Sequence, residues 1–236
     1  MLTAQQLMQL DPDRFRMDDF TPIVALEWFA ALQAGWVHNG DHNKPHAILH
    51  SGLHSDGFFL CKRVLGFANL REILAGAIVV RLARANMDHN IGGVFGSPYS
   101  SILLAAEVAR ILRVKVYVPE KDPTDPAGKC MIFKSDDPIP EGARLLQIEE
   151  LVTTFDSGEA TANAIVGGNP CPVAFMPFVG VLVHRPKIIN RTLADRREIV
   201  PFIEKQVSAW PADDCPLCKA GSPAVFPKKD WAKLTA

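Results

Sequence analysis

The sequence lacks an excess of charge of either sign. It has 25 lysines and arginines against 26 aspartates and glutamates, so its formal net charge is −1. A protein that holds nucleic acid through a broad positive surface needs a basic excess, and this composition excludes that class. Any anion that the protein binds must therefore be captured by a local group of side chains.

Long apolar runs and cysteines are also scarce. The longest apolar run, 173–183, contains Pro177 and Gly180 and is too short to cross a bilayer, so we expect no membrane partner. The first ten residues contain no lysine or arginine, which argues against a signal peptide. Five cysteines, an odd number without an export signal, indicate reduced thiols and a cytoplasmic protein.

Strand-like and helix-like segments alternate through the middle of the chain. The apolar pattern predicts strands at 91–95, 114–118, 144–148 and 173–184, and helices at 69–85, with Asn69 as N-cap, 102–112 and about 157–165. This alternation is typical of an α/β fold with a parallel sheet flanked by helices. We expect a helical extension over 1–45, a core with small hood strands over 46–190, and a C-terminal extension over 191–236. A helix over 191–208, broken at Pro201, is predicted in that extension.

The segment 145–158, LLQIEELVTTFDSG, carries the most chemistry. An apolar strand ends in Glu149 and Glu150, and a hydroxyl-rich turn then leads to a predicted helix. Ligands of open α/β sheets bind at the carboxyl ends of strands, and a helix N-terminus suits a phosphate monoester. Adjacent carboxylates suit a diol or a hydrated metal ion. The segment therefore predicts a site for a phosphorylated sugar; the alternative is a pair of solvated charges at the end of a strand.

The segment resembles the phosphoribosyl-diphosphate (PRPP) signature of type I phosphoribosyltransferases, and it is most similar to the orotate enzymes. Four further segments agree in order: HSGLHSDGFF with the base-binding segment, GVFGSPYSSILLAAEVA with the diphosphate loop, VPEKDPTDPAGKCM with the catalytic lid, and VLVHR with the last core strand. The resemblance implies a homodimeric pentosyltransferase with the type I phosphoribosyltransferase fold and a C-terminal extension. It would transfer phosphoribosyl from PRPP, with Mg²⁺, to a nucleobase, with orotate favoured, and serve pyrimidine biosynthesis.

The resemblance also implies residue roles. The catalytic residues would be Lys121 and Lys129 on the lid, which neutralise the diphosphate, and Glu149 and Glu150, which contact the ribose hydroxyls. The substrate-binding residues would be Thr153, Thr154, Asp156, Ser157 and Gly158 around the 5′-phosphate, Tyr99 and Ser100 in the diphosphate loop, and Ser51, Phe58, Phe59 and Arg185 around the base. The residue types alone leave other roles open: solvated lid lysines, core phenylalanines, a surface ion pair for Arg185, and a packing role for Tyr99.

Several positions depart from the family pattern. Phe155 and Asp156 follow Thr-Thr where the family has glycine, and a bulky ring and a carboxylate would both oppose a phosphate. His50 replaces a base-side lysine, Ser100 a diphosphate-loop lysine, and His184 an aspartate. Two alternatives follow: a non-catalytic protein that binds nucleotide, and a purine phosphoribosyltransferase in which 156–161, DSGEAT, belongs to a longer phosphate loop.

Cys215 and Cys218 form a Cys-Pro-Leu-Cys pair in the Pro-rich tail. Two thiolates are half of a tetrahedral zinc site. No second such pair exists, so the remaining ligands would be Cys171, a histidine or a partner chain. The pair predicts a structural Zn²⁺; a redox pair and two packed, reduced thiols are the alternatives.

Overall fold

A parallel five-stranded sheet forms the centre of the computed structural model, which describes residues 2–49, 51–88, 90–134 and 137–235. Its strand order is β11-β10-β9-β5-β6, and each neighbouring pair is parallel. The strands are β5 (Gly93–Phe95), β6 (Val116–Tyr117), β9 (Arg144–Val152), β10 (Ala174–His184) and β11 (Glu198–Glu204). The expected parallel sheet is confirmed.

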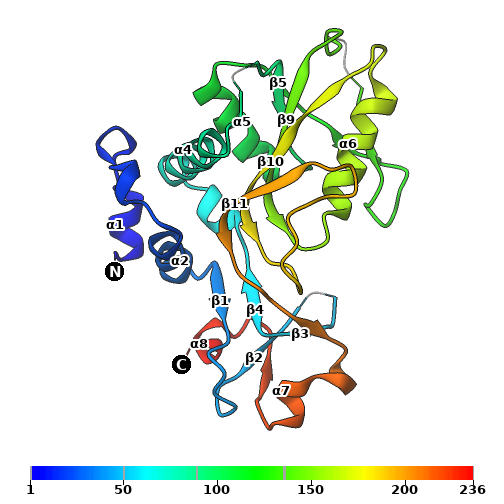
Figure 1. Cartoon of the computed structure of the whole chain (residues 1–236). Helices are drawn as coiled ribbons and strands as arrows, with labels where there is room; N and C mark the ends of the chain where they lie inside the picture. Colours follow the sequence, from blue (N-terminus) through cyan, green and yellow to red (C-terminus); the bar gives the residue numbers. More distant parts are fainter. Residues whose placement is uncertain (1, 50, 89, 135–136, 236) are drawn as a thin grey trace.

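Helices cover both faces of this sheet (Figure 1). On one face lie α4 (Ala68–Arg84) and α5 (Ser100–Leu112), with α1 (Ala4–Met8) and α2 (Pro22–Ala31) packed beside them; α6 (Asp156–Gly168) covers the other. Leu146 and Ile148 of β9 join the core under α4 and α5, whereas Leu145 joins the core under α6. This division follows from the alternation of side chains along a strand. No described helix is long and apolar enough to cross a membrane.

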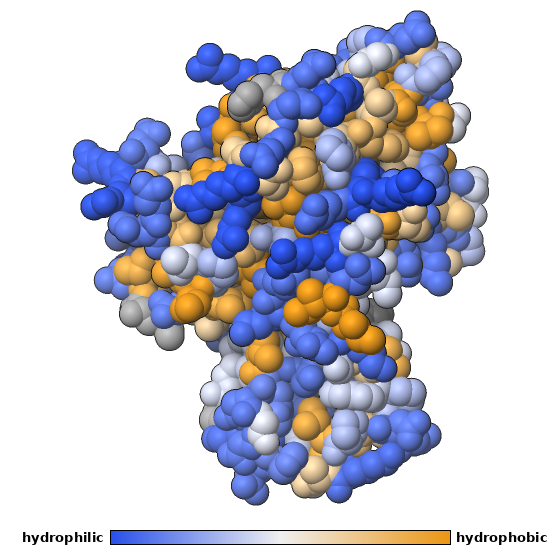
Figure 2. Space-filling model, in the orientation of Figure 1, coloured by the Kyte–Doolittle hydropathy of each residue, from blue (hydrophilic) through white to orange (hydrophobic). Residues whose placement is uncertain are grey.

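A smaller four-stranded sheet, in the order β12-β3-β2-β13, forms the second lobe, which we call the hood. The chain enters it at β2 (His46–Ile48) and β3 (His54–Ser55) and returns at β12 (Ala209–Trp210) and β13 (Ala224–Val225). The short α7 (Pro216–Lys219) lies between the last two strands, and α8 (Trp231–Leu234) follows them. Figure 2 shows a narrowing between the hood and the larger lobe, with mostly hydrophilic residues on the visible face of the hood.

Short elements connect the two lobes, and others form the segment expected to be a lid. A two-stranded antiparallel ribbon pairs β1 (Gly35–Val37) with β4 (Gly57–Phe59), and a second pairs β7 (Glu120–Lys121) with β8 (Met131–Ile132). The second ribbon occupies the segment expected as a lid loop. The remaining short helices are η1 (Pro12–Arg14), η2 (Met17–Asp19), α3 (Lys62–Leu65) and η3 (Ala212–Asp214).

Two local predictions are wrong. The helix expected over 191–208 is replaced by strand β11, and Pro201 is accommodated because β11 is the edge strand of its sheet, where a residue without an N–H is tolerated. Asn69 does not cap α4, which begins one residue earlier at Ala68. Its side-chain amide instead donates to the carbonyl oxygens of Leu7 and Leu10, both at 3.0 Å, and so ties α4 to the N-terminal segment.

Candidate functional site

Three segments that follow sheet strands meet at the carboxyl edge of the central sheet. They are the loop 96–99 between β5 and α5, the loop 153–155 between β9 and α6, and Arg185 directly after β10. This edge is where open α/β sheets bind ligands. The peptide bond between Pro98 and Tyr99 in the first loop is cis. Tyr99 is 70% exposed, and Ser100 begins α5.

Glu149 is buried beneath these loops, with 4% of its surface exposed. Its carboxylate accepts hydrogen bonds from Ser97 Oγ at 2.6 Å, Ser101 Oγ at 2.9 Å and Gln147 Nε2 at 2.6 Å. Burial raises the pKa of Glu149, and these hydrogen bonds act in the opposite direction because they favour the charged form. Both carboxylate oxygens therefore have protein partners, and the carboxylate joins β9 to the diphosphate loop and to α5.

The hydrogen-bonded network around Glu149 continues through the protein interior. Arg197 Nη1 donates to Gln147 Oε1 at 2.7 Å, and Arg197 Nε donates to Asp195 Oδ2 at 2.6 Å. Gln147 Nε2 also donates to the carbonyl oxygen of Gly158 at 3.0 Å, in the first turn of α6. The N-terminus of α6 and the diphosphate loop are thus held by one connected network.

Glu150 points to the opposite face of β9, because successive strand residues alternate. It is only partly buried, and its Oε2 has no hydrogen-bond partner. The pKa of Glu150 is raised to about 7, mainly by burial. A hydrogen bond from Ser100 opposes this rise, and the charge of Glu149 contributes to it. Among the described residues only Glu150, Arg185 and Trp28 carry such an unpartnered buried side-chain atom. Two of these three lie in the predicted site, and an unsatisfied buried polar atom needs an explanation such as a ligand.

A cavity of about 180 Å³ lies at the turn after β9 and is lined by Glu149 and residues 151–158. All five residues expected around the 5′-phosphate line it: Thr153, Thr154, Asp156, Ser157 and Gly158. The side chain of Asp156 is exposed in the first turn of α6, where its charge opposes an anion. The structure thus brings the predicted residues together, and their contact with a phosphate stays a prediction.

Phe155 adopts the backbone conformation usually reserved for glycine, with φ 76° and ψ 6°. Its ring is buried in a cluster with Val152, Val179, Val181 and Ile199. The cluster therefore accommodates much of the ring, although Phe155 also lines the cavity at this turn. The longer phosphate loop of the purine alternative is not formed, because Thr161 lies inside α6 and donates to the carbonyl oxygen of Ser157 at 2.7 Å.

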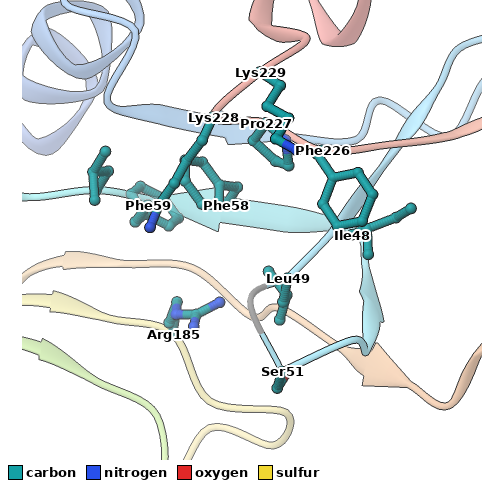
Figure 3. Close-up of a pocket in the computed structure, with 11 residues that line it drawn as sticks. Ile48, Leu49, Ser51, Phe58, Phe59, Arg185, Phe226, Pro227, Lys228 and Lys229 are labelled. Atoms are coloured by element: carbon teal, nitrogen blue, oxygen red, sulfur yellow. The ribbon is translucent and has the colours of Figure 1, made fainter.

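A larger cavity, of about 530 Å³, lies where the hood meets the central sheet (Figure 3). It contains all four residues expected around the base, and seven that the sequence did not indicate. The lining residues are Ile48, Leu49, Ser51, Phe58, Phe59, Leu60, Arg185, Phe226, Pro227, Lys228 and Lys229. In Figure 3 the segment 226–229 lies on one side of β4, and Arg185 and Ser51 lie on the other. The Phe-Pro-Lys-Lys run was the signal in the tail that could have suggested it.

Arg185 is half-buried beside this cavity, and its Nε has no hydrogen-bond partner. Burial lowers the pKa of Arg185, and neighbouring Cys61 and Asp56 oppose that shift. A guanidinium at this position is suited to pair with an anionic ligand group. The cavity, whose walls include phenylalanine rings, is thus lined by three cationic side chains: Arg185, Lys228 and Lys229.

The lid lysines do not line either cavity in the part of the chain that is described. Lys121 Nζ lies 5.8 Å from the centroid of the Tyr99 ring, which is a cation–π contact. Lys129 is exposed on the turn, where its backbone N–H donates to Asp125 Oδ2 at 2.7 Å. The catalytic role of both lysines stays a prediction.

Three further positions singled out by the sequence lie outside these two cavities. His50 is outside the described residues. His184 is buried, with its Nδ1 3.0 Å from Glu204 Oε1, so it contacts the neighbouring strand β11. Cys215 and Cys218 lie in the hood together with His46 and His54, and these four residues could hold a metal ion.

Curated relatives of the chain carry one enzyme name. The orotate phosphoribosyltransferase of Pelotomaculum thermopropionicum is 30% identical over 184 residues, which cover 77% of this chain and 87% of that protein. The orotate phosphoribosyltransferase of Caldanaerobacter subterraneus subsp. tengcongensis is 29% identical over 190 residues, 78% of this chain and 89% of that protein. The chain belongs to the orotate phosphoribosyltransferase family. It is therefore a type I phosphoribosyltransferase, an enzyme of the pentosyltransferase class.

A solved structure from this family has the same fold. The orotate phosphoribosyltransferase of Aeropyrum pernix superimposes with a TM-score of 0.57 at 17% identity, covering 75% of this chain and 92% of that one. No family model matches the chain. The sequence resemblance to this family is thus confirmed by the relatives, and the fold by the solved structure.

The contact between Phe155 and Gly158 yields a stability prediction. A Cβ on Gly158 would lie 2.7 Å from Cζ of Phe155, so Gly158→Ala should destabilise the protein by about 1–3 kcal/mol. In a Phe155→Gly background the clash is absent, and alanine should instead stabilise α6 by up to about 1 kcal/mol. Urea denaturation of the wild type, both single variants and the double variant measures this coupling. Equal costs of Gly158→Ala in both backgrounds would contradict the contact.

Proposed function

We propose that the protein is an orotate phosphoribosyltransferase, which transfers the phosphoribosyl group of PRPP to orotate and releases orotidine 5′-phosphate and diphosphate. The observation that carries this proposal is the 530 Å³ cavity with phenylalanine walls and three cationic side chains. Orotate is a planar ring with a carboxylate. Phe58, Phe59 and Phe226 suit the ring, and Arg185 and the lysines suit the carboxylate. A purine is uncharged and would leave these cations without a partner, which disfavours the purine alternative.

We assign different roles to the two glutamates of the proposed PRPP site. Glu150 has an unpartnered oxygen and accepts from a ribose hydroxyl. Glu149 is already bonded to protein donors, so we assign it the positioning of Ser97, Ser101 and the start of α6. The turn 153–158 receives the 5′-phosphate on backbone N–H groups and hydroxyls at a helix N-terminus.

The reaction breaks the bond between ribose C1 and a diphosphate oxygen and forms a bond from a base nitrogen to C1. Positive charge develops on the ribose and negative charge on the leaving diphosphate. The Glu150 oxygen and the Ser100 hydroxyl are hard donors that fit a hydrated Mg²⁺ brought by PRPP, and such an ion supplies charge neutralisation. Lys121 and Lys129 stabilise the diphosphate when the lid closes, and the closed lid excludes water. The ring nitrogen loses its proton as it bonds to C1, and water or the departing diphosphate accepts this proton, so no histidine general base is required.

A base panel tests the substrate. Purified protein is supplied with PRPP, Mg²⁺ and one of orotate, uracil, adenine or hypoxanthine, and diphosphate release is measured. We expect kcat/KM for orotate to exceed that for the uncharged bases by at least about 100-fold, because they leave the cavity cations unpaired. Omission of Mg²⁺ is the control for PRPP-dependent chemistry. Preferred turnover of adenine or hypoxanthine, or no turnover with any base, would refute orotate as substrate.

Lys228 tests the role of the tail in base binding. Lys228→Ala should raise KM for orotate by about tenfold or more, the effect of losing a charged hydrogen-bonding partner, and leave KM for PRPP unchanged. The matched control is Lys233→Ala, because Lys233 lies in α8, pairs with Asp230 at 2.7 Å and does not line the cavity. Steady-state kinetics with each substrate varied separates the two constants. A parallel rise of both KM values would argue against a base-side position for Lys228.

We further propose a homodimer in which the lid of each chain serves the neighbouring site. The position of Lys121 and Lys129 outside both described cavities of their own chain supports this arrangement. Lys121→Ala should lower kcat by about 100-fold or more, since it removes transition-state charge stabilisation, with little change in PRPP affinity.

A mixing experiment shows which chain the lid serves. Lys121→Ala and Glu150→Gln subunits are dissociated, mixed and reassociated, and the activity is compared with that of each variant treated alone. A shared site restores activity, because one of the two sites in a mixed dimer then has an intact lid and an intact Glu150. No gain on mixing, although mixed dimers are present by native mass spectrometry, would assign the lid to its own chain.

A further inference from the structure

Four potential metal ligands converge in the hood, and none of them lines the cavities proposed for PRPP and the base. His46 lies on β2 and His54 on β3, whereas Cys215 and Cys218 come from the segment around α7, more than 160 residues later in the chain. Their ligand atoms all lie within 4.8 Å of one another. Three of the four side chains are buried, with Cys218 the most exposed. Both thiols are free.

The separations match the edges of a tetrahedral zinc site. His46 Nε2 lies 3.5 Å from Cys215 Sγ and 3.4 Å from Cys218 Sγ. His54 Nδ1 lies 3.0 Å from His46 Nε2 and 3.2 Å from Cys218 Sγ. Zinc bonds of about 2.0–2.3 Å at tetrahedral angles give ligand–ligand separations of roughly 3.3–3.8 Å. These four of the six separations are therefore within a few tenths of an ångström of those around a tetrahedral zinc ion, and all six are below 4.8 Å.

The tautomer of His46 is fixed in the form that binds a metal. Ser222 Oγ donates its hydrogen to the carbonyl oxygen of Lys44 at 2.7 Å, so it accepts from His46 Nδ1 at 2.8 Å. The hydrogen of the neutral ring is then on Nδ1, and Nε2 presents a lone pair to the cluster. A hydrogen bond on the far nitrogen that orients the ring is the usual support of a metal-bound histidine.

Hydrogen bonds within the cluster do not account for its geometry. His46 Nε2 has three close neighbours, His54 Nδ1 and the two sulfur atoms, but its single in-plane lone pair accepts one good hydrogen bond. The other two contacts at Nε2 then bring polar atoms close together without a good hydrogen bond between them, which is unfavourable. One cation at the centre bonds to all four ligand atoms.

We propose that these four side chains bind one structural Zn²⁺ ion. Two thiolates and two imidazoles in a tetrahedral arrangement select zinc over hard cations such as Mg²⁺ and Ca²⁺, which prefer oxygen. Four protein ligands leave no open position, so the ion is structural rather than catalytic. The sequence left the other ligands of a zinc ion at Cys215 and Cys218 open. In this proposal they are His46 on β2 and His54 on β3, rather than Cys171 or a partner chain.

The ion would hold the tail against the hood, next to the base cavity. His46 is followed by Ile48 and Leu49, which line that cavity, and β13 pairs with β2 directly before Phe226. Trp231, five residues beyond Phe226, packs near Phe58 with ring centroids 6.3 Å apart. Because β13 is only two residues long and pairs with β2 at two positions, this pairing holds the tail weakly by itself. The zinc site would fix the position of residues 226–229, which form one wall of the cavity proposed for the base.

Metal analysis of the full chain tests the site without any measurement of activity. Protein purified under reducing conditions without chelator should contain about one zinc per chain. After zinc is exchanged for Co²⁺, the visible spectrum should show thiolate charge transfer and the intense bands of tetrahedral cobalt. Less than about a tenth of an equivalent after incubation with Zn²⁺, a Cys215–Cys218 disulfide in the isolated protein, or an octahedral cobalt spectrum would each overturn the proposal.

Variants separate the ligands from other cysteines. Cys218→Ser should lose the zinc, and Cys171→Ser, the matched control outside the cluster, should keep it. Ser222→Ala should weaken zinc binding by about 10–100-fold in competition with a chromophoric chelator, because it removes the group that orients His46. Full zinc content in Cys218→Ser, or its loss in Cys171→Ser, would contradict the assigned ligands.

A kinetic measurement tests the link to the base cavity, and this part alone rests on the proposed function. Loss of zinc in Cys218→Ser should raise KM for orotate several-fold and leave KM for PRPP unchanged. Unchanged KM values in a zinc-free variant would refute the support of the cavity wall but leave the metal site intact. A protein inactive with every base would refute the proposed function, whereas the zinc content would still decide the metal site.

Discussion

The buried carboxylate of Glu149 is the interaction on which the carboxyl edge of the central sheet, the proposed PRPP site, depends. A charged group under these loops is costly unless donors surround it, and leaving one such group unsatisfied costs about 1–3 kcal/mol or more. Its donors come from the loop 96–99, from the start of α5 and from Gln147, two residues earlier in β9. None of these elements can move independently without breaking a bond to that carboxylate. The alternation of β9 then leaves Glu150, the next residue, facing the other way with an oxygen to offer.

The cavity between the hood and the central sheet, proposed for the base, is held together differently. Its cavity has walls from the hood hairpin, from β4, from the end of β10 and from the tail, segments that are far apart in the chain. No single buried carboxylate connects them. The tail contacts the hood and β4 through two short strand pairings, through the packing of Trp231 near Phe58 and through the His/Cys cluster. The cavity at the turn after β9 is therefore fixed by the central sheet, whereas the cavity beside the hood depends on how well the tail is joined to the hood.

The sequence predicted the parts of the molecule that local pattern controls. The strand–helix alternation, the acidic segment and its turn, and Arg185 after the last long strand were all found from residues close together in the chain. Phe226 to Lys229 were missed because only the pairing of β13 with β2 brings them to the cavity. The histidines beside Cys215 and Cys218 were missed for the same reason, since the spacing between ligand pairs is set by the fold. The proline in β11 was misinterpreted because its tolerance depends on an edge position, which a sequence does not display.

Pro201 also affects how chains can associate. The free side of an edge strand is a row of backbone donors and acceptors on which a second chain can add a strand, and this is a common start of aggregation. In this protein, the segment 191–193 covers the beginning of β11. The backbone N–H of Ile199 donates to the carbonyl oxygen of Arg191 at 2.7 Å. Pro201, two residues further on, has no N–H to offer. This edge of the central sheet is thus protected against the addition of a strand from a second chain.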